Sequence, residues 1–256
     1  MTQTALGVIA GTGFYDLPEL SERELLVVET PYGAAKYLKG ILHGRETIFL
    51  SRHGVDHQIP PHRVNYRANI AAMKEIGVSE ILAINVVGGL GPDSGELVVV
   101  DDFIDFTKSR VNTFFDGSTA QGVVHTDMGE PFDQRLRQVW INACGNAQVP
   151  VVTTGVYGAF EGPRFETRAE IRAARGMGVT VAGMTLVPEV ILANEVKIPY
   201  ACISLVVNPA TGLGTKPVTM DDINIVIAKG SETLKKVLSH AARSLASTQE
   251  FVVGPA

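Results

Sequence analysis

A neutral amide ends one of the most hydrophobic segments of this sequence. The apolar run at 205–207 is followed directly by Asn208 and Pro209, a pattern typical of a buried strand that ends in a loop. Ligands of open α/β sheets usually bind at the carboxyl ends of the strands, so Asn208 is a candidate ligand contact. An amide in place of a carboxylate there would reflect the chemistry of the substrate.

Two more strand ends carry groups suited to an anion. Gly11, Thr12 and Gly13 follow an apolar run near residue 5, where backbone amides and the Thr12 hydroxyl can cradle a phosphate. Arg52 and His53 follow another run near residue 46, and arginine offers a fork of donors that suits phosphate oxygens. Read alone, the first loop is also consistent with a structural turn and the second with a solvated loop.

Further candidates have an equally good structural explanation. Val86, in NVVGGLG, has a backbone amide that could complete an anion site, but the same segment could be a tight turn. Glu166 lies at or near the start of a helix, where an acidic residue suits the helix dipole without any ligand. Thr185 could simply cap the helix that follows it, and Met184 could be a core residue. Spacing alone leaves these alternatives open.

Alternating strands and helices must position these candidates. Apolar runs typical of strands recur near residues 5, 24, 46, 80, 151, 179 and 200, and helical periodicity marks 64–77, 166–178, 187–197 and 219–247. The first two helices end at glycine, and Thr219 is suited to cap the last one. The alternation predicts an α/β fold in which a mixed, mostly parallel sheet is covered by helices. We expect residues 1–256 to form a single domain.

Composition excludes several classes of protein. The chain has 256 residues, 45% of them hydrophobic, and a formal net charge of -5 without a basic run, so we do not expect it to bind nucleic acid. Its cysteines, Cys144 and Cys202, lie in no CxxC or Cys/His cluster, which predicts no metal site. No signal peptide and no membrane-length apolar run is found. We therefore expect a cytoplasmic protein that does not bind a membrane.

The motifs together resemble a known family. GVIAGTGFYD, SRHG, PPHRVNYRANIAAMKEIG, NVVGGL, FFDGS, HTDMGEPFD, EGPRFETRAE and MTLVPEVILANE occur across almost the whole chain. In this order they resemble the trimeric purine nucleoside phosphorylases, and more closely the 5'-methylthionucleoside branch of that family. The resemblance implies a homotrimer in which inorganic phosphate, as co-substrate, attacks C1' of a purine nucleoside. It implies no metal and no organic cofactor, and it requires no nucleophile from the enzyme.

The resemblance also assigns roles around the sugar. It implies that Met184 lies against the ribose, and that phosphate is held by Thr12, Arg52, His53, the amide of Val86, and Thr185. Catalysis would then come from positioning and electrostatic stabilisation.

The base pocket resembles that of relatives that cleave 6-oxopurine nucleosides. Relatives that cleave 6-aminopurine nucleosides have Asp at the position of Asn208 and a second Asp at the position of Ala210. The 6-oxopurine relatives have Asn there, and a Glu in the segment matching Phe165, Glu166 and Thr167 accepts the N1 proton. The physical logic agrees, because hypoxanthine carries a proton on N1, whereas adenine presents a lone pair there.

The residues expected around the 5' end of the sugar indicate which 5' group the substrate carries. By resemblance, the start of the last helix lies at this end, where Met220 and Ile223 would give an apolar lining that suits a methylthio group, although both could simply be core residues. By resemblance, His125 reaches the pocket of a neighbouring subunit. The two pockets together predict phosphorolysis of 5'-methylthioinosine to hypoxanthine and 5-methylthioribose 1-phosphate. The alternatives are phosphorolysis of methylthioadenosine, phosphorolysis of inosine or guanosine, and a non-catalytic nucleoside-binding protein.

Overall fold

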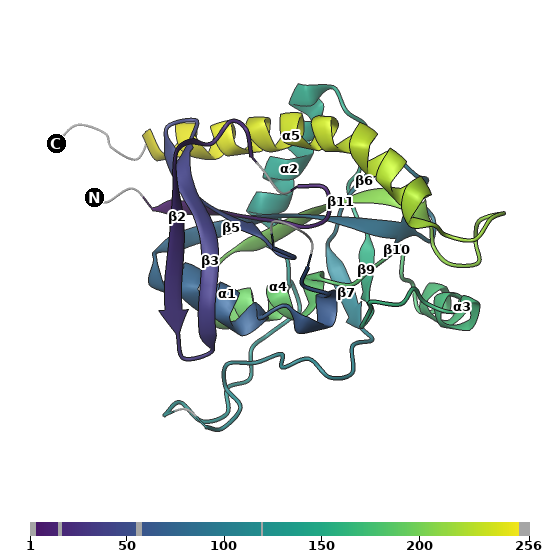
Figure 1. Cartoon of the computed structure of the whole chain (residues 1–256), viewed down its shortest axis with the longest axis horizontal. Helices are drawn as coiled ribbons and strands as arrows, with labels where there is room; N and C mark the ends of the chain where they lie inside the picture. The colour runs from purple at the N-terminus through teal and green to yellow at the C-terminus, as the bar shows by residue number, and fades with distance from the viewer. Residues whose placement is uncertain (1–3, 15–16, 55–57, 119, 251–256) are drawn as a thin grey trace.

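The structure is a computed structural model that describes residues 4–14, 17–54, 58–118 and 120–250. Within these residues one mixed sheet of eleven strands forms the centre of the molecule (Figure 1). The strands are β1 (Ala5–Ala10), β2 (Ser21–Thr30), β3 (Gly33–Leu42), β4 (Arg45–Ser51), β5 (Val78–Gly89), β6 (Leu97–Val99), β7 (Asp102–Asp105), β8 (Val151–Val152), β9 (Val156–Ala159), β10 (Val181–Gly183) and β11 (Tyr200–Pro209).

Most strand pairs in this sheet are parallel. The parallel pairs are β1 with β4 and β5, β5 with β11, β6 with β8, and β9 with β7 and β10. The antiparallel pairs are β2 with β3, β3 with β4, β5 with β10, and β6 with β11. The β2–β3 hairpin lies at one edge of the sheet. The central strands β1, β4, β5 and β11 run parallel to one another, so their carboxyl ends lie close together.

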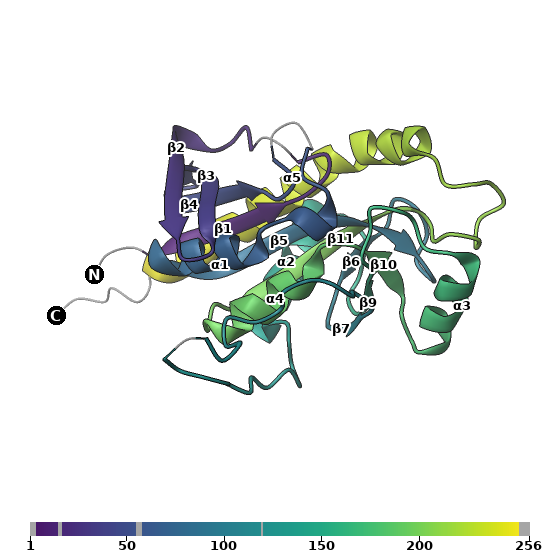
Figure 2. The same ribbon diagram turned by 60° about the horizontal axis from the view of Figure 1, so that its bottom comes forward.

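Helices cover both faces of the sheet. They are α1 (Tyr66–Glu75), α2 (Gln134–Ala147), α3 (Arg168–Gly176), α4 (Leu186–Glu195) and α5 (Met220–Glu250). In two views, α2 and α5 lie on one face, and α1 and α4 lie on the other (Figures 1 and 2). Each face has its own apolar core: Trp140 and Leu238 belong to the first, and Met73 and Val190 to the second. The predicted fold class is confirmed.

The expected helix caps are present. Gly77 and Gly178 follow α1 and α3 with positive φ angles of 81° and 95°, a conformation that glycine adopts without strain. At the start of α5, the backbone amide of Asp222 donates to the Thr219 hydroxyl at 3.2 Å. These features mark where α1 and α3 end and where α5 begins.

Several elements differ from the sequence-based prediction. The run from residue 151 is two strands, because β8 pairs with β6 whereas β9 pairs with β7 and β10. The helix α2 and the strands β3, β6 and β7 were not predicted. The residues that α2 buries, among them Leu136, Trp140 and Ala143, recur three and four positions apart, which is the spacing of a helix that buries one face. This face packs against α5 and β11.

Candidate active site

One pocket, with a volume of about 200 Å³, opens at the carboxyl ends of the central strands. Its walls come from the loops after β1 and β4, the ends of β5 and β11, the segments before α3 and α4, and the first turn of α5. Of the residues singled out in the sequence, it is lined by Thr12, His53, Val86, Phe165, Glu166, Met184, Thr185, Asn208, Met220 and Ile223. Arg52 and His125 are not among its lining residues.

The loops that carry Thr12 and His53 are joined by the backbone. The Arg52 amide donates to the carbonyl of Ala10 at 2.8 Å, which ties the loop after β4 to the end of β1. The Nδ1 atom of His53 lies 2.8 Å from the carbonyl oxygen of Ile59. Since that oxygen can only accept, Nδ1 carries a hydrogen, and the tautomer and orientation of the ring are fixed beside the pocket.

Arg52 lies behind the pocket wall in a buried ion pair. Its Nε and Nη2 atoms donate to the two carboxylate oxygens of Glu189, each at 2.7 Å, and the Tyr200 hydroxyl donates to the same carboxylate at 2.6 Å. Burial disfavours the guanidinium charge, but Glu189 outweighs it, so the pKa of Arg52 is raised above its usual range. The Nη1 atom lies near Gly11, where an added Cβ would be only 3.1 Å from it.

Glu166 precedes α3 instead of belonging to it. Thr167 is the N-cap residue, and Glu170 completes the capping box, so the carboxylate within the first turn of α3 is that of Glu170, and Glu166 lies just before the helix. Only 8% of Glu166 is exposed, whereas its neighbour Phe165 is 38% exposed. Burial raises the pKa of the Glu166 carboxyl, and its own backbone amide and Arg164 only partly oppose that shift. A carboxyl in this environment is suited to a hydrogen-bonded ligand.

Asn208 lies where β11 departs from regular pairing with β5. The register shifts between Val206 and Asn208, which places Asn208 opposite Gly88. Gly88 lies close to this amide, since a Cβ there would be 3.4 Å from Asn208 Nδ2. The same Nδ2 donates to the carbonyl of Pro209 at 2.7 Å. Val86, two residues earlier on β5, lines the same pocket.

Thr185 occupies the N-cap position of α4, but its side chain makes no capping hydrogen bond. The alternative in which Thr185 serves only as a cap is therefore wrong. Next to it, Met184 packs on Gly162, where a Cβ would lie 2.6 Å from the methionine sulfur. Both side chains line the pocket.

The first turn of α5 closes another side of the pocket. Ile223 is 4% exposed and belongs both to the core and to the pocket wall, whereas Met220 is 51% exposed. Ile223 is therefore partly a core residue, as the alternative interpretation expected, whereas Met220 is not a core residue. His125 lies exposed on the long segment between β7 and α2, which extends away from the sheet (Figures 1 and 2).

Asn85 is a pocket residue that the sequence analysis missed. It is 3% exposed, and its Oδ1 accepts a hydrogen bond from Ser204 at 2.6 Å. Its Nδ2 is buried and has no hydrogen-bond partner among the described residues. Because an unpaired buried donor is costly, Nδ2 is a candidate ligand contact. The signal was available, since Asn85 interrupts the apolar run ILAINVV as Asn208 ends its own run.

Among the residues that the structure describes, no group of three or more His, Cys, Asp or Glu is placed to hold a metal ion. Likewise, no helix within the described ranges is long and apolar enough to cross a membrane.

Known proteins resemble this chain over nearly its full length. A 6-oxopurine nucleoside phosphorylase from Pyrococcus furiosus is 42% identical over 239 residues, which cover 91% of this chain and 90% of that protein. A probable S-methyl-5'-thioinosine phosphorylase from Methanothermobacter thermautotrophicus is 43% identical over 252 residues, covering 95% and 85%. The solved structure of methylthioadenosine phosphorylase from Schistosoma mansoni in complex with adenine has a TM-score of 0.90 at 32% identity, covering 96% of this chain and 92% of that one.

The family profile described as the Phosphorylase superfamily matches residues 5–243. The family resemblance read from the motifs, and with it the prediction of an enzyme of the nucleoside phosphorylase type, is confirmed. By sequence and by fold, this chain belongs to the phosphorylase superfamily.

Proposed function

We propose that the chain transfers the 5-methylthioribosyl group of S-methyl-5'-thioinosine to inorganic phosphate, releasing hypoxanthine and 5-methylthioribose 1-phosphate. The observation that carries the proposal is that Glu166 and Asn208 line one pocket, which Met220 and Ile223 also line. The first pair suits a 6-oxopurine, and the second suits a thioether.

The base end of the pocket supports a 6-oxopurine. Hypoxanthine carries a proton on N1 that the Glu166 carboxylate can accept, whereas adenine would present a lone pair to the same carboxylate. The donor end of the Asn208 amide is used by the Pro209 carbonyl, so Oδ1 is available to accept from N7 as the base leaves. That contact strengthens as N7 takes up a proton, so it favours the transition state over the ground state.

The opposite end supports phosphate binding. Thr12, His53 and Thr185 line the same pocket, and the buried Nδ2 of Asn85, which has no hydrogen-bond partner among the described residues, adds a donor. We propose that Arg52 acts through Nη1 beside Gly11, with Glu189 holding the guanidinium in place. The amide of Val86 would complete the set. Held beneath C1', the phosphate would attack as the base departs, and the gain in rate would come from positioning and charge stabilisation.

A second substrate class is favoured by one observation. Met220 is half exposed, so the 5' end of the pocket is partly open in a single chain and could admit a 5'-hydroxyl. This favours a 6-oxopurine nucleoside phosphorylase acting on inosine or guanosine, the activity named for the relative from Pyrococcus furiosus.

We further propose that residues 1–256 act as one domain within a homotrimer, with phosphate as co-substrate and without a cofactor. His125 is exposed and outside its own pocket, so a neighbouring subunit is the partner that could place it at the 5' end of the sugar. Closure of that end by a second chain would make the methylthio group, and not water, the neighbour of Met220.

The test is to incubate the purified protein with methylthioinosine in the presence and absence of inorganic phosphate. Hypoxanthine is measured by chromatography, and the sugar phosphate is detected by ³¹P NMR. We expect hypoxanthine and a sugar 1-phosphate in equal amounts, and only with phosphate. Release at the same rate without phosphate would indicate a hydrolase, and no release from any purine nucleoside would indicate a binding protein.

A further inference from the structure

The segment that follows β7 is joined to the loop that follows β9. The Phe106 amide donates to the carbonyl of Ala159 at 2.8 Å, and the rings of Phe106 and Phe160 stack with their centroids 4.9 Å apart. Farther along, the Lys108 amide donates to the Glu161 carboxylate at 2.5 Å. The two segments are therefore held side by side.

Arg110 extends this link to two more parts of the molecule. Only 2% of its side chain is exposed, and its Nε lies 3.6 Å from a carboxylate oxygen of Glu161, which balances the buried charge. Its Nη2 donates to the carbonyls of Phe160 and Glu161 at 3.1 and 2.7 Å. Its Nη1 donates to the carbonyl of Val187 at 2.7 Å and to the Tyr66 hydroxyl at 3.2 Å. One planar guanidinium thus joins the loop after β9, the start of α4 and the start of α1.

Each part that Arg110 joins carries residues of the pocket wall. Glu166 follows the loop after β9, and Met184 precedes α4; both line the pocket. The Tyr66 hydroxyl donates to the carbonyl of Pro61 at 2.9 Å, and Pro61 is a third lining residue. Arg110 and Tyr66 themselves do not line the pocket.

The three wall segments meet at Gly162. A Cβ there would lie 2.6 Å from the Met184 sulfur and 3.4 Å from Cγ of Pro61, so the segments approach one another closely at this residue. Gly162 directly follows Glu161, whose carbonyl accepts from Arg110. The hydrogen bonds of Arg110 therefore act beside the point where the walls converge.

We propose that Arg110 is a positioning residue that sets the distance between the base end of the pocket and its ribose end, so that an intact nucleoside contacts both at once. The proposal rests on the proposed function, because it assumes that Glu166 binds the base and that Met184 lies against the ribose. A free base or a phosphate ion needs only one end of the pocket, whereas a nucleoside needs both. Arg110 should therefore matter more for the nucleoside than for its parts.

The test compares the affinity for methylthioinosine with the affinities for hypoxanthine and for inorganic phosphate, each measured alone by titration calorimetry. Arg110→Lys keeps the charge, but one ammonium group cannot replace a guanidinium that donates to three carbonyls and a hydroxyl. We expect the Kd of methylthioinosine to rise about 10-fold and those of hypoxanthine and phosphate to change less than about 3-fold. With phosphate present, kcat/KM for methylthioinosine should fall about 10- to 100-fold, because the reacting groups are misplaced.

Arg137→Lys is the matched control. Arg137 is also buried and donates to backbone carbonyls, those of Val100 and Thr153 at 3.1 and 2.7 Å, but it does not line the pocket. We expect this variant to lose stability and to keep all three affinities. An unchanged nucleoside Kd in Arg110→Lys, an equal rise in Arg137→Lys, or an equal rise for all three ligands in Arg110→Lys would each overturn the proposal.

The same titrations separate this proposal from the proposed function. If the wild type binds methylthioinosine but does not cleave it with phosphate, the proposed function fails while the comparison of affinities can still be read. A wild type that does not bind the nucleoside would overturn both.

A second variant applies if Arg110→Lys does not fold. Tyr66→Phe keeps the ring, whose centroid lies 5.5 Å from the Arg110 guanidinium carbon, and removes the hydroxyl that connects Arg110 to Pro61. We expect the Kd of methylthioinosine to rise about 3- to 10-fold, the range for losing one hydrogen bond, with the other two affinities kept. Tyr37→Phe is its control, because the buried Tyr37 hydroxyl donates to the Asn69 carbonyl at 2.6 Å away from the pocket-lining residues. A wild-type nucleoside Kd in Tyr66→Phe, or an equal rise in Tyr37→Phe, would overturn the proposal.

Discussion

Glu189 and Glu166 are buried glutamates beside the same pocket, but they have different surroundings. Glu189 is 0% exposed and accepts from Arg52 and Tyr200, so its carboxylate is paired within the protein. Glu166 is 8% exposed and lines the pocket, and the groups that favour its charge do not offset its burial. The first glutamate belongs to the structure, and the second is left for a ligand.

The two proposed ends of the pocket also differ in how the protein holds their side chains. At the proposed phosphate end, a backbone hydrogen bond joins the loop after β4 to the end of β1, and Arg52 is paired with Glu189 of α4. At the base end, Glu166 and Asn208 extend from a segment between elements and from an irregular strand end. This arrangement suggests that the reaction depends on the first end and the choice of base on the second.

The largest effect is expected from breaking the ion pair at the phosphate end. Glu189→Gln leaves the Arg52 charge buried without its counter-ion, which should lower the free energy of unfolding by about 3 to 5 kcal/mol. Urea denaturation measures the loss.

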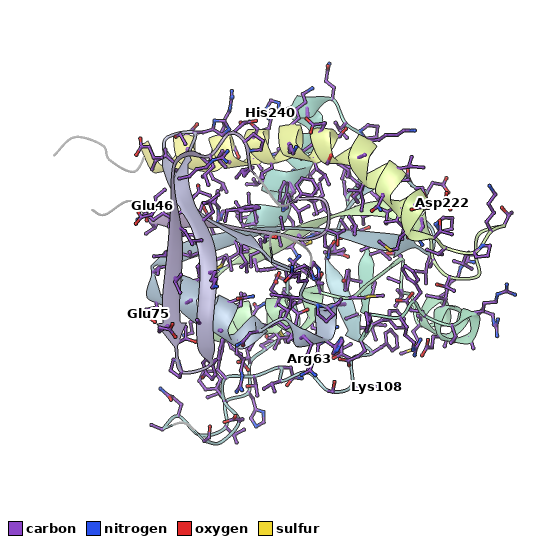
Figure 3. The ribbon with its side chains drawn as sticks, in the orientation of Figure 1. Glu46, Arg63, Glu75, Lys108, Asp222 and His240 are labelled. Carbon is purple, nitrogen blue, oxygen red and sulfur yellow. The ribbon has the colours of Figure 1, made fainter. Side chains whose placement is uncertain are left out.

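The control for that change is Glu75→Gln, because Glu75 is exposed at the end of α1. In Figure 3 it lies at the opposite side of the molecule from Asp222 and the first turn of α5. We expect a change of less than about 0.5 kcal/mol there. Equal losses in both variants would mean that the Arg52 pair does not stabilise the phosphate end.

The next effect acts on the base end alone. The double variant Glu166→Ser with Asn208→Asp removes the acceptor for N1–H and supplies a carboxyl that can donate to N7 and accept from an amino group. Each buried pairing contributes about 1 to 3 kcal/mol, so the preference for methylthioinosine over methylthioadenosine should fall at least about 30-fold. Asn208→Asp alone should move the ratio in the same direction by less. An unchanged kcat/KM ratio would remove the basis for the base-pocket assignment.

A smaller effect is expected from Glu166→Gln, which keeps the shape and removes the charge. Hydrogen bonds to charged groups contribute about 1.5 to 3 kcal/mol, so kcat/KM for methylthioinosine should fall roughly 10- to 150-fold. Glu170→Gln is the comparison, since Glu170 belongs to the capping box and does not line the pocket. That variant should lose stability but keep its base preference. A loss of preference in both would point to the helix, and not to the carboxylate.

The smallest effect is a dependence of base preference on pH. Because burial raises the pKa of Glu166, lowering the pH protonates it earlier than an exposed glutamate, which titrates near about 4.3. The neutral acid accepts more weakly from N1–H of hypoxanthine and can donate to N1 of adenine. The kcat/KM ratio of methylthioinosine to methylthioadenosine should therefore decrease as the pH falls, and Glu166→Gln should abolish this dependence. A ratio that is flat with pH in the wild type would contradict the role of Glu166.

Much of the fold was predictable because the central strands are continuous apolar runs. The runs that became β1, β5 and β11 are almost fully buried, and burial on both faces leaves that signature. The strand β3 carries Lys36, Lys39 and Gly40, so its sequence does not look like a strand. The segment forms a strand because it pairs with β2 and β4.

The strand ends that form the site could be predicted from the sequence. The contacts between side chains from distant segments could not. Thr12, His53 and Asn208 follow or end apolar runs, and the fold brings strand ends together. The pairing of Arg52 with Glu189 spans 137 positions and depends on how α4 packs on the sheet. A glutamate inside the apolar run LVPEVILA was the visible sign of a buried partner.

In the proposed reaction, Glu166 and Asn208 select a 6-oxopurine, while Met220 and Ile223 at the start of α5 select a methylthio group. The most direct measurement is the rate of phosphate-dependent base release from methylthioinosine, methylthioadenosine and inosine at equal, sub-saturating concentrations. We expect a strong preference for methylthioinosine over both of the others. A preference for methylthioadenosine would contradict the roles of Glu166 and Asn208, and equal use of inosine would contradict selection by Met220 and Ile223.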